Sequence, residues 1–132
     1  MDFISSFANS MIITVFSVIL IIIFSAMAAW VLVRDRTTKS KVVFYIFTAG
    51  MIVPFQAVMI PLVQWMGKFR FGSISMIGTH YGLIFMYIGF GCCMSIFLYH
   101  GFIKSIPAEL EEAAVIDGCT KFQTFRKIVF PL

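Results

Sequence analysis

The stretch "MIITVFSVILIIIFSAMAAWVLV", residues 11–33, decides the class of this protein because it runs without a charged side chain. At ~1.5 Å per residue, a helix of this length spans about 35 Å, which is enough to cross the hydrocarbon core of a bilayer. The segment therefore predicts a transmembrane helix. The residues before it carry Asp2 but no Lys or Arg, so they lack the basic region of a secretory signal peptide. We expect the segment to stay in the mature chain.

The composition of the whole chain agrees with an integral membrane protein. Of its 132 residues, 61% are hydrophobic and 12% are charged, and the mean hydropathy is +0.99. A net charge of +4 does not predict nucleic-acid binding, since the ten basic residues form no single run. The three cysteines are an odd number, and two of them are adjacent, so we expect neither a disulfide framework nor a metal site, and no cofactor.

Two further apolar segments, residues 42–66 and 80–103, predict a second and a third span. The second contains Pro54 and Pro61, which bend a helix and free backbone carbonyls, so we expect it to pack inside a bundle. Its amides Gln56 and Gln64 favour hydrogen bonds between helices, and lining a solute pathway is the alternative. The predicted fold is an all-α polytopic transmembrane helix bundle with three spans.

Lysine and arginine are distributed unevenly over the connections. The predicted first turn and the region from residue 104 onward hold eight of the ten, whereas the second loop holds Lys68 and Arg70. Three spans place the first two of these regions on one side of the membrane, and the positive-inside rule makes that side cytoplasmic. The N-terminus is therefore expected outside. The eight residues are Arg34, Arg36, Lys39, Lys41, Lys104, Lys121, Arg126 and Lys127.

The polar region at residues 104–131 predicts two short helices joined by a glycine turn. Pro107 suits a first helical position, and Gly118 ends the first helix. The segment "TKFQ", residues 120–123, matches a capping box, so a second helix should begin there and run toward Pro131. The spacing predicts that one face of the first helix gathers the apolar residues Ile106, Leu110, Ala113 and Ala114.

The first of these two helices is acidic, which bears on what it touches. It holds Glu109, Glu111 and Glu112 and no basic residue. Helices that rest on a lipid surface favour basic polar faces, so a protein partner fits this helix better than a membrane surface does.

The polar C-terminal region resembles a loop of a known protein family. The segment "EAAVIDGCTKFQTFRKIVFP", residues 112–131, resembles the EAA loop of binding-protein-dependent ABC importer permeases, whose pattern is Glu-Ala-Ala, three residues, Gly, nine residues, Ile, one residue, Leu-Pro. Phe130 stands where the family usually has Leu. The stretches "FIKSIPAELEEAA" and "IVPFQAVMIPL" and the "RD" turn are similar to the maltose and glycerol-phosphate branch. The matching positions are Glu112, Ala113, Ala114, Gly118, Ile128 and Pro131.

The resemblance implies a permease subunit of the bacterial-type inner membrane that imports sugars or related polyols. Its loop would be a coupling helix for cytoplasmic ABC ATPase subunits, with Glu112 as the charged contact, Ala113 and Ala114 as the close-packed surface, and Gly118 as the turn. A second permease subunit, an extracytoplasmic solute-binding protein and membrane lipid would be its other partners. ATP hydrolysis is expected on a separate subunit, because this chain has no G-x-x-x-x-G-K-[ST] loop. We expect no enzymatic activity here.

The resemblance also implies that the chain is partial. Permeases of this branch have six spans, and the three expected here would match the second, third and fourth, with the loop following the fourth. A chain with only these three should not transport by itself. The alternatives are a small noncatalytic scaffold or regulatory membrane protein whose hairpin binds another cytoplasmic partner, or a nonfunctional fragment of a permease. The solute is inferred from the branch alone.

Overall fold

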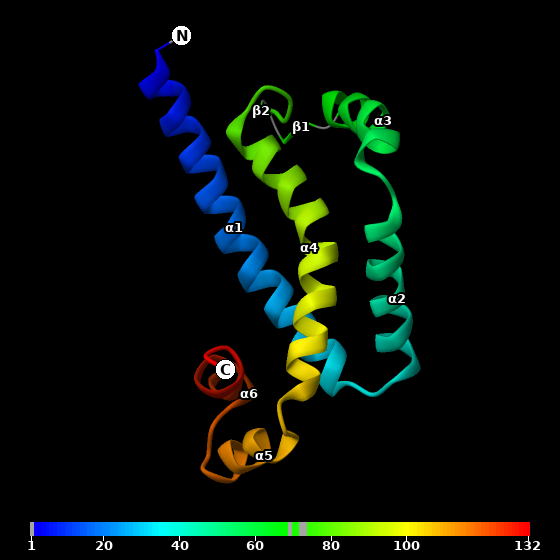
Figure 1. Cartoon of the computed structure of the whole chain (residues 1–132), viewed down its shortest axis with the longest axis vertical. Coiled ribbons are helices and arrows are strands. Elements are labelled where there is room, and N and C mark those ends of the chain that lie inside the picture. Colours follow the sequence, from blue (N-terminus) through cyan, green and yellow to red (C-terminus); the bar gives the residue numbers. More distant parts are fainter. Residues whose placement is uncertain (1, 69, 72–73) are drawn as a thin grey trace.

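The computed structural model describes residues 2–68, 70–71 and 74–132, and helices dominate it (Figure 1). The predicted all-α class is confirmed. The long helices are α1 (Phe3–Arg34), α2 (Thr38–Ile52), α3 (Phe55–Lys68) and α4 (His80–Ser105). The C-terminal hairpin consists of α5 (Ala108–Ile116) and α6 (Lys121–Thr124), and α6 continues as a π-helix, η1 (Phe125–Val129). Two short strands, β1 (Arg70–Phe71) and β2 (Ile74–Ser75), pair antiparallel between α3 and α4, which the sequence analysis did not predict.

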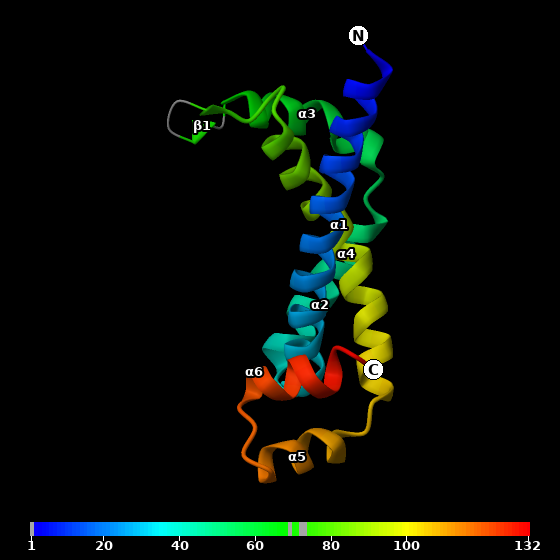
Figure 2. The same ribbon diagram turned by 90° about the vertical axis from the view of Figure 1, so that its left-hand side faces the viewer.

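Helix α4 lies between α1 and α2 and packs against both (Figure 1). The start of α1 and the α5–α6 hairpin lie at opposite ends of the molecule. Figure 2 shows α3 lying across the direction of α1 and α4 at the end near the N-terminus. The hairpin is therefore next to the α1–α2 turn and far from α3.

By length and composition, α1 and α4 are each able to cross a membrane. Helix α1 begins at Phe3, eight residues before the segment that the sequence analysis marked as a span, since no helix breaker separates the two. Helices α2 and α3 meet the same criterion only as a pair, and a bend of 101° separates them. Among the described residues the candidate spans are thus two, or three if the bent pair crosses as one.

The second apolar segment is broken, whereas the sequence analysis expected one bent helix. Helix α2 ends at Ile52, directly before Val53 and Pro54, and α3 begins at Phe55. Pro54 lacks an amide proton and its ring clashes with the preceding turn, so it ends the helix. Pro61 lies inside α3 without interrupting it.

The seam between α1 and α4 is lined by small residues. Ser17, Ser25 and Ala29 are buried on α1, where their size lets the two backbones approach. On α4, a Cβ added at Gly91 would lie 2.5 Å from Ile21 Cδ1. A close approach of two helices at Gly91 was not predicted from the sequence.

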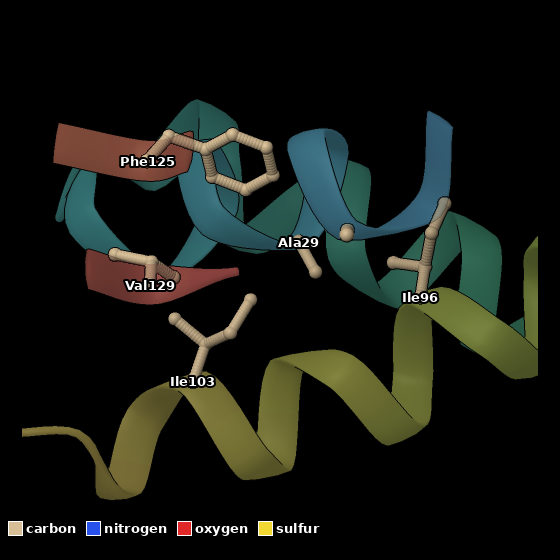
Figure 3. Packing of buried hydrophobic residues seen from close by; sticks show 6 residues of the cluster. Ala29, Ile96, Ile103, Phe125 and Val129 are labelled. Carbon is tan, nitrogen blue, oxygen red and sulfur yellow. The ribbon is translucent and has the colours of Figure 1, made fainter. Parts of the chain in front are cut away.

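A cluster of buried apolar residues joins the hairpin to the long helices (Figure 3). Ala29 of α1 and Ile96 and Ile103 of α4 pack together with two residues of η1, Phe125 and Val129. All five are less than 8% exposed. The second limb of the hairpin is therefore part of the folded body.

The α1–α2 turn is fixed by a carboxylate. Asp35 Oδ2 accepts hydrogen bonds from the hydroxyls of Ser40 at 2.7 Å and Thr37 at 3.0 Å. These bonds, that from Ser40 first, lower the pKa of Asp35 below its ordinary value of 3.8. The turn therefore keeps a negative charge beside the first residues of α2, where the helix dipole is positive.

Candidate functional site

The glycine turn of the hairpin has the geometry that the sequence predicted. Gly118 has φ +85°, a left-handed conformation that side chains disfavour. Its amide donates to the Val115 carbonyl at 3.0 Å, and the Cys119 amide donates to the Ala114 carbonyl at 2.9 Å. This pair of bonds is a Schellman motif, which satisfies carbonyls that the end of α5 would leave open.

The second limb begins with the predicted capping box. The Thr120 hydroxyl accepts from the Gln123 amide at 3.3 Å, and the Gln123 side chain accepts from the Thr120 amide at 2.8 Å. After one turn the helix widens into η1, where the Phe130 amide donates to the Phe125 carbonyl at 2.8 Å. This widening was not predicted from the sequence.

We expect Thr120→Ala to destabilise the second limb by about 1 kcal/mol, because it removes the cap that holds the Gln123 amide. Hydrogen exchange should then speed up for the amides of residues 121–130 in detergent-solubilised protein. Thr38→Ala is the matched control, since Thr38 is an exposed first-turn threonine for which the structure gives no side-chain hydrogen bond. Equal exchange in the two variants would contradict the role of the cap.

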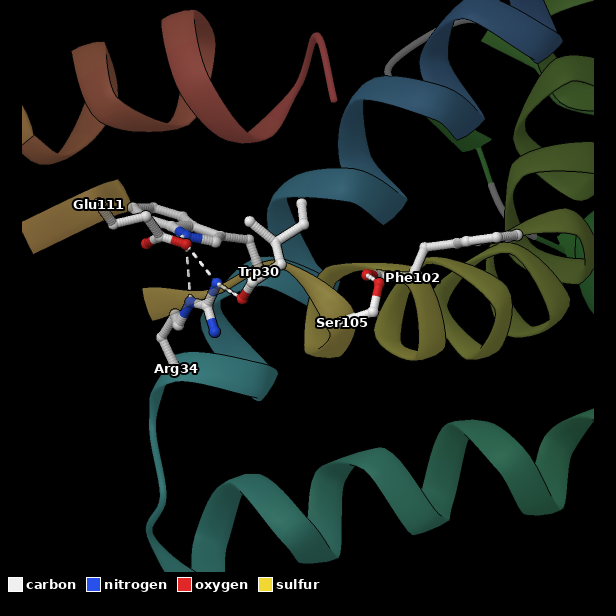
Figure 4. Close-up of polar contacts among 6 residues, drawn as sticks. Trp30, Arg34, Phe102, Ser105 and Glu111 are labelled. Carbon is white, nitrogen blue, oxygen red and sulfur yellow. Dashed lines mark hydrogen bonds and ion pairs between the residues drawn. The ribbon is translucent and has the colours of Figure 1, made fainter. Parts of the chain in front are cut away.

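Glu111 of α5 is held by two residues from the end of α1 (Figure 4). Trp30 Nε1 donates to Glu111 Oε2 at 2.9 Å, and Arg34 Nε donates to Glu111 Oε1 at 2.7 Å. Arg34 and Glu111 also form an ion pair whose side chains are 25% and 12% exposed. We call these three residues the Trp30–Arg34–Glu111 cluster.

The two α1 residues of this cluster contact more than α5. Arg34 Nη2 donates to the carbonyl of Ile106, which lies in the link between α4 and α5, at 3.1 Å. The Trp30 ring packs on Phe125 of η1 with the ring centroids 5.3 Å apart. The end of α1 thus contacts the link and both limbs of the hairpin.

The face of α5 that turns toward the rest of the chain carries Glu111 and Ala114. Ala114 is buried and Glu111 is half-buried, whereas Leu110 and Ala113 are exposed. Of the predicted apolar set Ile106, Leu110, Ala113 and Ala114, Ala114 is the one that is buried, because Arg34 and Trp30 hold Glu111 and so fix the rotation of the helix. Only Ala114 of the Ala113–Ala114 pair is covered by this chain.

Glu112 is exposed and lines a cleft of about 870 Å³ between α5 and the α1–α2 turn. Val115 and Ile116, which are 56% and 85% exposed, lie on the same side of α5. Such exposed apolar side chains beside charges are typical of a surface that binds another protein. The cleft is further lined by Trp30, Val31, Val33, Arg34, Asp35, Arg36, Ala108, Glu111, Lys121 and Thr124.

The remaining predicted site residues lie apart from this cleft. Ile128 is half-buried in η1, and Pro131 lines a smaller apolar groove between α1, α4 and the C-terminal residues. Gln56 and Gln64 are exposed on α3, at the other end of the molecule. In the described part of the chain no hydrogen bond joins either amide to another helix, so the interhelical bonds expected for them are not seen among these residues. No three metal-binding side chains gather among the described residues.

Trp30 and Arg34 were not predicted as site residues, and Glu111 was counted only among the acidic residues of its helix. The sequence did contain one feature that could have indicated this pair. Trp30 and Arg34 are four residues apart at the end of an apolar segment, so they share one face of the helix.

Comparison with known proteins places these features in a family. Residues 19–132 match the model of the binding-protein-dependent transport system inner membrane component. The chain is 49% identical over 127 residues to the probable starch degradation products transport system permease protein AmyC of Thermoanaerobacterium thermosulfurigenes. It is 43% identical over 129 residues to the melibiose/raffinose/stachyose import permease protein MelC of Bacillus subtilis. It is 37% identical over 129 residues to the multiple sugar-binding transport system permease protein MsmG of Streptococcus mutans.

The coverage of these matches is uneven. They include 96%, 97% and 96% of this chain but only 44%, 45% and 44% of the respective relatives. The chain therefore spans less than half of the length of each of them.

Proposed function

Because this chain belongs to the family of binding-protein-dependent transport system inner membrane components, we propose that it forms part of the permease of an ATP-driven sugar importer and that its hairpin docks on the ATPase. It is a multi-pass membrane protein. ATP hydrolysis belongs to a separate cytoplasmic subunit, and this chain transmits the motion of that subunit to its long helices.

The observation that carries this proposal is the hairpin itself. A capped turn at Gly118 and a capping box at Thr120 fix its two limbs, and the Trp30–Arg34–Glu111 cluster fastens it to α1. At the same time Glu112, Val115 and Ile116 remain open to a partner. A rigid element with an uncovered face suits the transmission of a push from another protein.

The orientation that we propose puts the hairpin in the cytoplasm and the N-terminus outside. Eight of the ten basic residues lie at the end of the molecule that holds the α1–α2 turn and the hairpin, whereas Lys68 and Arg70 lie at the other end (Figure 1). The positive-inside rule favours the first end as cytoplasmic.

Further partners follow from the uncovered apolar surface of the long helices. Many large side chains of α1, α2 and α4 are exposed, among them Phe16, Phe24 and Ile46. In a membrane such side chains contact lipid or other helices. We propose that lipid and a second permease subunit cover them and that an extracytoplasmic solute-binding protein delivers the solute.

A solute pathway beside the α2–α3 break is part of the proposal. The Phe55 ring meets Phe90 edge-on with centroids 5.1 Å apart, and a Cβ at Gly50 would lie 3.4 Å from Cys93 Sγ, so the break is level with the middle of α4. Non-helical backbone at this depth is tolerated where other protein covers it or where it lines a water-filled cavity. Gln56 lies just past the break, and Gln64 lies two turns further along α3, where amides suit sugar hydroxyls.

The docking proposal is tested by co-purification with the cognate ATPase subunit. Glu112→Arg should reduce recovery of the ATPase at least about tenfold, because a reversed charge at a contact costs more than 1.4 kcal/mol. Glu109→Arg is the matched control, since it makes the same charge change on the same helix at an exposed position that does not line the cleft.

Three outcomes are informative. Loss with Glu112→Arg and retention with Glu109→Arg support docking through the cleft. Equal loss in both variants would mean that the overall charge of α5, and not Glu112, governs the contact. Absence of ATPase binding by the native chain would contradict the proposed function and favour a hairpin that serves another partner.

A further inference from the structure

Helix α5 has few means of attachment to the long helices. It packs on α6 and η1, its partners within the hairpin. The chain connects it to α4 through Ile106 and Pro107, which have extended backbone conformations rather than helical ones. Such a link transmits a push poorly, because it is not braced by helix hydrogen bonds. The firm polar contacts of α5 are those that Glu111 makes with α1.

We propose that the Trp30–Arg34–Glu111 cluster makes α1 the helix that receives the motion of the hairpin, with Trp30 and Arg34 as positioning residues. This inference rests on the proposed function, since it assumes that an ATPase moves the hairpin. It goes further by naming the receiving helix and the contacts that transfer the motion.

The chemistry of the cluster suits this role. Both oxygens of Glu111 are engaged, Oε2 by Trp30 and Oε1 by Arg34, so the carboxylate cannot turn without losing a bond. Charge-assisted hydrogen bonds of this kind are stronger than neutral ones, and partial burial limits competition from water. Arg34 Nε and Nη2 both contact Glu111 Oε1, and Nη2 also donates to the Ile106 carbonyl, an arrangement that a lysine ammonium on its flexible chain would not hold.

The unbroken length of α1 also suits its role as the helix that receives the motion. Helix α1 has 32 residues without a break, so a displacement of its Arg34 end moves the whole helix, about 48 Å in length at ~1.5 Å per residue. The α2–α3 segment is interrupted by its bend of 101° and cannot act as one body in this way. Trp30 also packs on Phe125, so α1 follows both limbs of the hairpin.

The test measures coupling in the assembled importer, reconstituted in lipid vesicles with the ATPase and the binding protein. Arg34 and Glu111 also line the cleft, so the readout is solute uptake per ATP hydrolysed by importer that has retained the ATPase. In Arg34→Ala and Glu111→Ala this ratio should fall about tenfold. Glu109→Ala is the matched control and should behave as the native protein does. The double variant Arg34→Ala/Glu111→Ala should lose less than the product of the two single losses, since both changes remove the Arg34–Glu111 contact. Each change also removes one bond of its own, from Arg34 to Ile106 or from Trp30 to Glu111.

Hydrogen exchange of the α5 amides in the same assembly, without ATP, provides a readout that does not depend on transport. Exchange should rise about tenfold in Glu111→Ala and stay unchanged in Glu109→Ala, because among the described residues it is Glu111 that makes the side-chain hydrogen bonds between α5 and α1. Glu111→Gln, which keeps the side-chain shape, should lie between the two.

The other possible results of these experiments would overturn the inference, and they separate its failure from that of the docking proposal. Native uptake per ATP in the Glu111→Ala importer, or multiplying losses in the double variant, would overturn the inference while leaving the docking proposal intact. Loss of ATPase binding in the cluster variants but not in the control would show that the cluster belongs to the docking surface, which also overturns it. If the native protein does not bind the ATPase, the proposed function fails first, and the inference fails with it.

Discussion

Replacing Gly118 with proline is expected to abolish the proposed binding of the ATPase and to unfold the hairpin while leaving the long helices intact. Gly118 has φ +85°, whereas the proline ring fixes φ near −65°. Proline would also remove the amide that donates to Val115. Together these changes should cost about 3 kcal/mol or more locally, since they remove both the left-handed residue and one bond of the Schellman motif.

Gly118→Pro is expected to act through the backbone conformation at this position, and the variant Gly118→Asn tests this. A Cβ added at Gly118 would meet nothing within 4 Å, so a side chain fits in space. Gly118→Asn should therefore retain most ATPase binding, because asparagine tolerates the left-handed region better than other residues with a side chain.

Co-purification with the ATPase and hydrogen exchange of residues 108–130 should distinguish the two variants, with Gly118→Pro exchanging fast and Gly118→Asn slowly. Helical content from circular dichroism should stay close to native in both, since α1 and α4 hold most of the helix. If Gly118→Pro binds the ATPase as well as the native chain does, the ordered turn is not required for docking.

Replacing Gly82 with alanine should destabilise the fold by about 3 kcal/mol, at the upper end of what overpacking costs. Gly82 is buried in the first turn of α4, and a Cβ there would clash with the carbonyl oxygen of Met76. The clashing atom belongs to the backbone of Met76, so a change of side-chain rotamer cannot relieve the clash. The Thr79 hydroxyl holds that carbonyl in place by donating to it at 3.1 Å while accepting from the Gly82 amide at 3.2 Å.

Gly89→Ala is the matched control for this change. It lies on the same helix, and a Cβ there would meet nothing within 4 Å. Alanine should stabilise that position by up to about 1 kcal/mol, since glycine is a poor helix former. Thermal unfolding in detergent, followed by circular dichroism, should therefore move in opposite directions for the two variants. Equal midpoints would mean that the chain segment around Met76 yields without cost.

Local features of the hairpin were predictable because their causes lie within a few residues of one another. The end of α5 at Gly118 and the start of α6 at Thr120 follow from a backbone angle and from a cap that joins residues three apart. The apolar segments that form α1 and α4 were predictable for a similar reason. Crossing a bilayer requires a certain length and an apolar composition of the segment and does not depend on a particular neighbour.

The break after α2 was predictable only in part. Pro54 marked the position at which the helix is disturbed. Whether a proline produces a kink or a break depends on the contacts that hold the two sides. Pro61 has the same chemistry and leaves α3 continuous, whereas Pro54 stands where Phe55 packs on Phe90 and the chain turns by 101°.

The sequence by itself determined the membrane class, the helical segments, the glycine turn with its cap, and the resemblance to the permease family. Only the tertiary structure decided which of three neighbouring glutamates turns inward. Glu109, Glu111 and Glu112 have the same chemistry and lie on the same helix, and the local Glu-Ala-Ala pattern marks Glu112 rather than the glutamate that turns inward. Glu111 is selected by Arg34, 77 positions earlier in the chain, and by Trp30, 81 positions earlier. A partner at that distance along the chain is fixed only when α1 and α4 have packed, because their packing sets where the end of α1 meets α5.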